Sequence, residues 1–225
     1  TREDKCGNRL IYKGSFNSLK AFTKGKLDIP FSDIDTSWLN KYEKWLRSKD
    51  NKETTISLMF RTLRSTYNKA IKAKCARKSD YPFDDYKINK FDTTTQKRAI
   101  AKTDVLKFTT EVQPIGKQQY MELSKDIFVF SYLCGGINFT DIANLTNENI
   151  QNGRLHYIRQ KTKKPIKIGI PQEAMQIIEK YSKESKGYLF PILDSKKHKT
   201  ALQKQNRIHK ILGKVNKNLK LLAAD

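Results

Sequence analysis

The sequence predicts a mainly α-helical protein with a small antiparallel β-sheet, divided into two domains. Amphipathic patterns of helical period fill the first 90 residues, whereas later helical patterns flank two short β-rich segments. A chain of 225 residues has room for two small domains that each bury a core without metals or disulfides. We expect a helical domain over residues 1–90, a linker over 91–99 and a mixed domain over 100–225.

The first domain is expected to contain three helices. The earliest covers Tyr12–Lys24, and the next lies within Phe31–Lys49, where Asp35 or Thr36 can cap a run of apolar residues spaced by three and four. The third helix covers Thr54–Lys74. Proline then ends the helical pattern in the segment YPFDDYKI, and the polar, Thr-rich segment NKFDTTTQK is typical of a linker.

The third helix carries a polar stripe opposite its apolar face. Ile56, Phe60 and Leu63 share the apolar face. The polar stripe contains two arginines, an asparagine and a lysine: Arg61, Arg64, Asn68 and Lys72. On one helix alone such a stripe is a solvated face, so its interpretation as a binding surface depends on the charge of the whole chain.

The second domain is expected to open with a capped amphipathic helix over Lys102–Val112 and a largely buried helix over Gln118–Cys134. A Gly-Gly pair interrupts the second of these helices, and INFTDIANLTNENI then adds a further helical turn. A turn is expected over Gln151–Gly153.

Two short strands, Leu155–Ile158 and Ile166–Ile170, are then joined by RQKTKKP as a hairpin. A helix follows, with Pro171 near its first turn. Thr200–Ala224 indicates one or two basic helices, separated near Gly213.

The charge of the chain indicates a polyanionic partner. It holds 45 Lys plus Arg against 23 Asp plus Glu, a formal net charge of +22, with a pI near 9.8. Lysine and arginine bind phosphate backbones by releasing condensed counterions. The alternative, a lysine-rich surface that only confers solubility, needs a much smaller excess of charge.

Other features exclude several classes of protein. A hydrophobic content of 37% suffices for a packed core, which excludes a disordered basic tail. The longest apolar run, Ile127–Cys134, is too short to cross a bilayer. Three widely spaced cysteines favour neither a disulfide framework nor a zinc site. Without a Gly-rich phosphate loop or a carboxylate cluster, we expect no nucleotide, metal or other cofactor.

Read in order, these segments resemble the tyrosine recombinase (phage integrase) family, especially integrases of mobile elements in Bacteroides-like bacteria. FSDIDTSWLNKYEKWLRSK, TTISLMFRTLRSTYNKAIKA and YPFDDYKI are similar to the family's SAM-like core-binding domain. QKRAIAKTDVLKF, FSYLCGGINFTDIANLTNENI and RLHYIRQKTKKPIKIGIP resemble the first part of its catalytic domain. NRIHKILGKVNKNLKLLAA resembles the helix that precedes the family's His-x-x-Arg motif. The resemblance implies DNA binding, DNA integration and DNA recombination.

The resemblance also assigns roles within the hairpin. The Lys-Thr pair of the family maps onto Lys161 and Thr162, which makes Lys161 the general acid for the leaving 5′ oxygen. The neighbouring cations Arg159, Lys163 and Lys164 are expected to contact backbone phosphates.

The first catalytic arginine of the family is absent. The usual pattern places it at Asn138, and the nearest relatives place it at Gly135; neither residue supplies a guanidinium. We expect positions 135 and 138 to share a helix face about one turn apart. Asp141 occupies the position of an acidic residue that braces the family's site, and the alternative is an exposed helix carboxylate.

The family's His-x-x-Arg motif and tyrosine nucleophile are expected beyond Asp225. The chain would then bind double-stranded DNA without cleaving it. The parent recombinase would cut and rejoin DNA through a 3′-phosphotyrosyl intermediate, self-associate on DNA as a synaptic tetramer, and act in the bacterial cytoplasm at the nucleoid.

Three other functions remain open. The first is a non-catalytic DNA-binding regulator of recombination or a degenerate integrase, which the missing arginine favours. The others are a type IB topoisomerase, which the core-binding pattern disfavours, and an RNA-binding protein, whose signatures are absent. The sequence that follows residue 225 in the parent gene would separate an enzyme from a binder.

Overall fold

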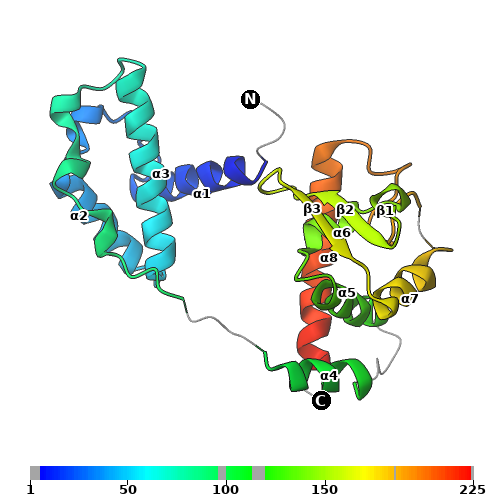
Figure 1. The fold of residues 1–225 in the computed structure, drawn as a ribbon. Helices are drawn as coiled ribbons and strands as arrows, with labels where there is room; N and C mark the ends of the chain where they lie inside the picture. Colours follow the sequence, from blue (N-terminus) through cyan, green and yellow to red (C-terminus); the bar gives the residue numbers. More distant parts are fainter. Residues whose placement is uncertain (1–5, 96–99, 113–119, 185, 224–225) are drawn as a thin grey trace. The chain divides into compact units, whose positions relative to one another are not determined.

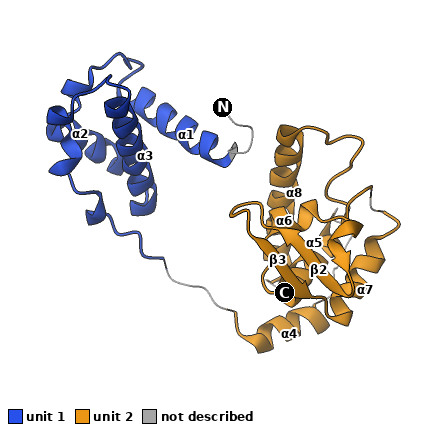
Figure 2. Ribbon diagram, turned by 45° about the horizontal axis from the view of Figure 1, so that its top comes forward, with its two compact units in different colours: residues 1–98 blue, residues 99–225 orange. Residues whose placement is uncertain are grey.

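The computed structural model describes residues 6–95, 100–112, 120–184 and 186–223. The chain divides into two compact units, Thr1–Arg98 and Ala99–Asp225 (Figure 2). The predicted class, mainly α with a small antiparallel sheet, is confirmed (Figure 1). Of the predicted linker over 91–99, residues 96–99 lie outside the described residues.

The described residues of unit 1 form three long helices and four single 3-10 turns. The helices are α1 (Cys6–Phe22), α2 (Thr36–Arg47) and α3 (Glu53–Lys72). Helix α1 begins six residues before the predicted Tyr12, because its first turn lacks the apolar periodicity on which the prediction depended. The short 3-10 turns are η2 (Phe31–Asp33), η3 (Lys78–Asp80), η4 (Pro82–Asp84) and η5 (Ile88–Lys90).

The cap of α2 is Asp35, one of the two residues that the sequence offered. Its Oδ1 accepts a hydrogen bond of 2.7 Å from the backbone N–H of Trp38. This bond satisfies one of the helix-terminal donors that have no partner within the helix.

Aromatic rings fill the core of unit 1. Tyr42, Phe60 and Tyr67 are fully buried, and the predicted apolar face of α3 supplies the last two. The Tyr67 hydroxyl donates to the carbonyls of Phe31 (2.9 Å) and Asp80 (2.8 Å), which satisfies its polar end within the core. The core thus joins the 3-10 turns to the helices and holds α3 with its polar stripe outward.

Unit 2 packs helices against a three-stranded antiparallel sheet of order β1-β2-β3. The strands are β1 (Ile150–Gln151), β2 (Arg154–Ile158) and β3 (Pro165–Gly169), with Leu155 opposite Ile150 and Ile168. The helices are α4 (Lys102–Thr110), α5 (Met121–Leu133), α6 (Phe139–Asn144), α7 (Gln172–Tyr181) and α8 (Ala201–Leu222). A 3-10 turn, η6 (Asn147–Asn149), precedes the first strand.

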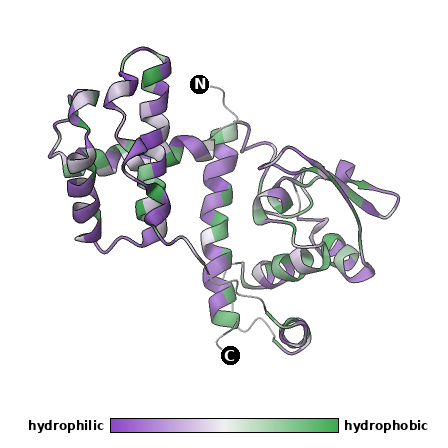
Figure 3. Ribbon diagram, turned by 60° about the vertical axis from the view of Figure 1, so that its left-hand side comes forward, coloured by the Kyte–Doolittle hydropathy of each residue, from purple (hydrophilic) through white to green (hydrophobic). Residues whose placement is uncertain are grey.

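The core of unit 2 lies between α5, α7, α8 and the inner face of the sheet. Phe130, Leu155 and Phe190 are fully buried in it. Helix α8 alternates hydrophilic and hydrophobic residues along its length (Figure 3), and it buries Ile208, Ile211 and Val215. This pattern is typical of a helix with one buried face and one solvated face.

Helix α8 is continuous, so of the one or two helices expected over this stretch the structure forms one: packing of its apolar face outweighs the poor helix propensity of Gly213. Three other details of unit 2 differ from the prediction. Helix α4 has Ala101 at its N-cap and no side-chain cap. The sequence pattern did not predict strand β1, because this strand contains only two residues. Gln151 belongs to β1, so the turn that was expected over Gln151–Gly153 contains only Asn152 and Gly153.

Within the described residues, no helix is long and apolar enough to cross a membrane. The same part of the chain contains no group of three or more His, Cys, Asp or Glu side chains that could hold a metal ion.

Candidate nucleic-acid interface

The polar stripe of α3 lies on the solvent side of unit 1. Arg61, Arg64, Asn68 and Lys72 are all exposed, while the opposite face of the helix lies in the core. Eleven residues separate Arg61 from Lys72, which at 1.5 Å per residue corresponds to about 16 Å. The major groove of B-DNA is about 12 Å wide, so the stripe is long enough to cross it.

The cations of this stripe are free of acidic partners. Elsewhere in unit 1, Arg47 pairs with Glu43 (3.0 Å) and Glu53, and Lys78 pairs with Asp84 (2.7 Å). No carboxylate of the described residues forms an ion pair with Arg61, Arg64 or Lys72. Their full charge therefore faces solvent, as phosphate contacts require.

A second group of exposed cations lies on the loop between β2 and β3 in unit 2. The loop is closed by two backbone bonds, from the N–H of Arg159 to the carbonyl of Lys164 (2.9 Å) and from the N–H of Lys163 to the carbonyl of Arg159 (2.8 Å). Lys163 adopts a left-handed conformation, with φ 57°, which reverses the chain. The loop exposes four predicted site residues: Arg159, Lys161, Lys163 and Lys164.

Asp141 joins this loop to α6. It is only 3% exposed, so the alternative of a solvated helix carboxylate is wrong. Its Oδ1 accepts from the backbone N–H of Gln160 (2.8 Å), and its Oδ2 accepts from Nδ2 of Asn138 (2.6 Å). A buried carboxylate that accepts two hydrogen bonds fixes the groups that donate to it.

Positions 135 and 138 do not share a helix face, and that prediction is wrong. Helix α5 ends at Leu133, and Gly135 and Gly136 follow in left-handed conformations, with φ 67° and 78°. Asn138 is the N-cap of α6, where its Oδ1 accepts from the N–H of Asp141 (3.1 Å). The two glycines, which readily adopt positive φ, therefore form the predicted interruption, and this turn separates position 135 from the cap at position 138.

The pKa of Tyr157 responds to the charges of Asp141 and Arg159. Burial raises the pKa of its phenol, the negative charge of Asp141 raises that pKa further, and the positive charge of Arg159 lowers it. Both charges therefore act on one side chain of β2. Cys134 lies buried in the neighbouring core, and burial raises the pKa of its thiol to about 11, so this cysteine stays protonated at neutral pH.

Gln160 is the contact that sequence reasoning missed. It takes part through its backbone N–H, a group that every non-proline residue carries. No residue type could have marked this position. The only available signal was its place next to the Lys-Thr pair of the hairpin.

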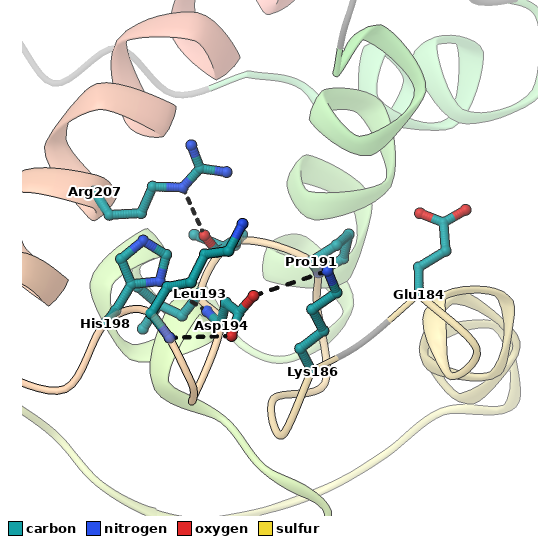
Figure 4. A pocket seen from close by; sticks show the side chains of 9 residues that line it. Glu184, Lys186, Pro191, Leu193, Asp194, His198 and Arg207 are labelled. Atoms are coloured by element: carbon teal, nitrogen blue, oxygen red, sulfur yellow. Dashed lines mark hydrogen bonds and ion pairs between the residues drawn. The ribbon is translucent and has the colours of Figure 1, made fainter.

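A separate pocket of about 290 Å³ lies between residues 186–198 and α8 (Figure 4). Lys186, Asp194, His198 and Arg207 are among its lining residues, and none of the predicted site residues is. Arg207 donates from Nε to the Ile192 carbonyl (3.0 Å) and from Nη2 to the Tyr120 hydroxyl (3.1 Å). Asp194 donates its backbone N–H to Nδ1 of His198 (2.9 Å). These hydrogen bonds hold residues 186–198 against α8, so we interpret the residues that line the pocket as structural.

Comparison with known proteins identifies the fold. Residues 1–88 match the sequence profile of the phage integrase SAM-like domain. Two structures of the Tn1549 transposon integrase, each bound to a circular intermediate DNA, align with the chain at TM-scores of 0.61 and 0.59, both at 19% identity. A lambda integrase tetramer bound to a Holliday junction aligns at a TM-score of 0.62 and 14% identity. The fold is that of a tyrosine recombinase.

The resemblance to tyrosine recombinases is thereby confirmed at the level of the fold, and residues 1–88, within unit 1, match the SAM-like domain. The two Tn1549 alignments each cover 81% of this chain and 61% of the integrase, and the lambda alignment covers 95% and 60%. The chain thus spans about three fifths of the length of these recombinases. No curated protein sequence matches it. The assignment to Bacteroides-type mobile elements stays a prediction.

Proposed function

We propose that this chain binds double-stranded DNA as part of a site-specific tyrosine recombinase. One observation carries the proposal: the SAM-like domain holds an exposed stripe of cations without acidic partners along α3, in a chain of net charge +22. The cationic hairpin of unit 2 supports it. The recombinase structures that share the fold are described as complexes with DNA.

For the whole recombinase we propose DNA cleavage and rejoining through a 3′-phosphotyrosyl link. In this scheme Lys161 protonates the leaving 5′ oxygen, and the other hairpin cations hold backbone phosphates. Asp141 positions the hairpin. We further propose that the protein self-associates on DNA and acts at the bacterial nucleoid, without a cofactor, because the phosphotyrosyl link conserves the energy of the broken bond.

The salt dependence of duplex binding tests this proposal. If the stripe and the hairpin neutralise about six phosphates, log affinity plotted against log salt concentration should have a slope near −5. The measurement is fluorescence anisotropy with a labelled 30-base-pair duplex at several salt concentrations. Affinity that does not change with salt would refute the proposal.

Two arginine variants sharpen this experiment. Arg64→Ala should reduce the slope by about 1 and weaken binding to all duplexes alike, because it removes one phosphate contact. The matched control is Arg47→Ala, which removes the same charge from a residue that already pairs with Glu43 and Glu53. An equal loss in both variants would show that total charge, and not the stripe, controls binding.

A second candidate function is a non-catalytic DNA-binding regulator of recombination. This function is favoured because positions 135 and 138, where the family carries its first arginine, are occupied by Gly and Asn. The two functions differ in one measurement on the full-length protein: incubation with a nicked suicide substrate. An enzyme accumulates a covalent protein–DNA adduct, whereas a regulator binds the same DNA and forms none.

A further inference from the structure

The predicted catalytic centre lacks the first arginine of the family, one of the groups expected to hold the reacting phosphate. Gly135 has no side chain, and the side chain of Asn138 caps α6. We infer that Arg159, at the base of the β2–β3 loop, supplies this guanidinium and binds the phosphate at which Lys161 would act. This inference rests on the proposed function and assigns a residue to the same site.

Asp141 holds residues 138 and 160 on one carboxylate. Asn138 donates to Oδ2 and Gln160 donates to Oδ1, at 2.6 and 2.8 Å. Arg159 directly precedes Gln160, and consecutive Cα atoms are about 3.8 Å apart. The backbone of Arg159 is therefore fixed beside the position at which most of the family carries its arginine.

The backbone of Arg159 is fixed while its side chain is free. Its N–H and its carbonyl both take part in the bonds that close the loop, with Lys164 (2.9 Å) and Lys163 (2.8 Å). The side chain is exposed, and within the described part of the chain no hydrogen bond or ion pair occupies the guanidinium. On a fixed backbone, phosphate binding has to order only the side chain, and the guanidinium breaks no existing bond of the described residues when it binds.

The chemistry favours Arg159 over the lysines of the same loop. A guanidinium presents two parallel N–H donors to two phosphate oxygens and stays charged at every physiological pH. The Lys163 and Lys164 ammonium groups carry charge without this fork.

Arg154 provides an internal control for this assignment. It lies at the start of β2, whereas Arg159 directly follows the end of that strand, and it is also exposed; it pairs with Gly169 at the opposite end of the hairpin. Removal of either arginine changes the charge of the chain by the same amount. Of these two arginines, only Arg159 is next to Gln160, whose backbone N–H donates to Asp141.

A double-mutant cycle on the whole chain tests the inference. Log affinity for a labelled 30-base-pair duplex is measured against log salt for the unaltered chain, Arg159→Ala, Asn138→Arg and the double variant. Arg159→Ala should reduce the slope by about 1, equivalent to roughly fourfold in the ratio of affinities between 50 and 200 mM salt. Asn138→Arg should restore the slope in the Arg159→Ala background and add little to the unaltered chain, since both positions address one phosphate.

The control repeats this cycle with Arg154→Ala in place of Arg159→Ala. Asn138→Arg should not restore the slope that Arg154→Ala reduces. If Asn138→Arg adds the same increment in all backgrounds, the two positions contact different phosphates and the inference fails. A slope that Arg159→Ala leaves unchanged also overturns it, while the binding function itself survives. Salt-independent binding of the unaltered chain would overturn the proposed function, and this inference with it.

A direct measurement covers the case in which Asn138→Arg disturbs the α6 cap. In a chain with ¹⁵N-labelled arginine, the Nε–H signal of Arg159 should shift when the duplex is added, and the Arg154 signal should shift less. Each signal is assigned from its alanine variant. An Arg159 signal that does not move in the presence of saturating duplex would overturn the inference without any change at position 138.

Discussion

Lys161 is the residue whose proposed role can be separated from DNA binding most sharply. It lies exposed on the hairpin between two backbone-fixed residues, Gln160 and Lys163. A general acid is needed only when the 5′ oxygen leaves. In the full-length protein, Lys161→Ala should slow cleavage by roughly 10²- to 10⁴-fold while affinity falls far less.

The test uses a 5′-bridging phosphorothiolate substrate, because sulfur leaves readily without a proton. Single-turnover cleavage of this substrate should recover in Lys161→Ala. Lys163→Ala and Lys164→Ala should instead weaken binding slightly and show no such recovery. If either of these two controls recovers while Lys161→Ala stays slow, the general acid is the lysine replaced in that control and not Lys161.

Asp141 provides a second prediction at the scale of one residue. Asp141→Asn replaces one accepting oxygen by an NH₂ group that faces a donor, either Gln160 N–H or Asn138 Nδ2. An unsatisfied buried donor costs about 1–3 kcal/mol, so urea denaturation should show a loss of this size. Amide hydrogen exchange at Gln160 should accelerate.

The control for Asp141→Asn is Glu148→Gln, the same chemical change at an exposed carboxylate on η6. It should leave both the stability and the exchange of Gln160 unchanged. If the two variants behave alike, Asp141 does not hold the hairpin.

At the scale of elements, two glycines should respond oppositely to the same substitution. Gly136 follows α5 with φ 78°, a conformation that costs an L-residue roughly 1–2 kcal/mol. Gly213 lies inside α8 with helical backbone, and a Cβ there would meet no atom within 4 Å. Gly136→Ala should therefore destabilise the protein by about 1–2 kcal/mol, whereas Gly213→Ala should stabilise it by up to about 1 kcal/mol.

Chemical denaturation followed by circular dichroism measures both changes. The pair needs no further control, because each variant adds one methyl group in open space and only the backbone conformation differs. Destabilisation by both variants would mean that α8 bends or breaks at Gly213 in solution.

At the scale of the whole molecule, the two units have separate cores. The clusters around Phe60 in unit 1 and around Leu155 in unit 2 share no residue. Both tryptophans, Trp38 and Trp45, lie in unit 1, so tryptophan fluorescence reports that unit alone. The chain therefore carries a natural probe for independent unfolding.

We expect the two units to unfold independently. Phe60→Ala should lower the stability measured by tryptophan fluorescence by about 3–5 kcal/mol, because it leaves a cavity in the core of unit 1. Leu155→Ala should leave the fluorescence transition in place while amide exchange in unit 2 accelerates. A fluorescence transition that moves equally in both variants would show that the units unfold as one.

Local sequence patterns were enough to predict the helices of unit 1, the hairpin and the cationic surfaces. Helical periodicity is a local property, so the pattern around Phe60 identified a core face and Arg64 a solvent face without knowledge of the fold. The cation-rich loop near Lys161 was equally visible, because a net charge of +22 and the order of the segments are written in the sequence alone.

The assembly of the candidate site depends on contacts between distant residues. Nineteen residues separate Asp141 from the backbone N–H of Gln160, and a backbone donor leaves no mark in a sequence. The unbroken α8 across Gly213 likewise depends on packing, because glycine permits helical and non-helical conformations and the surrounding core selects one. Residue types thus established the chemistry available to this protein, and long-range contacts established which of those groups meet.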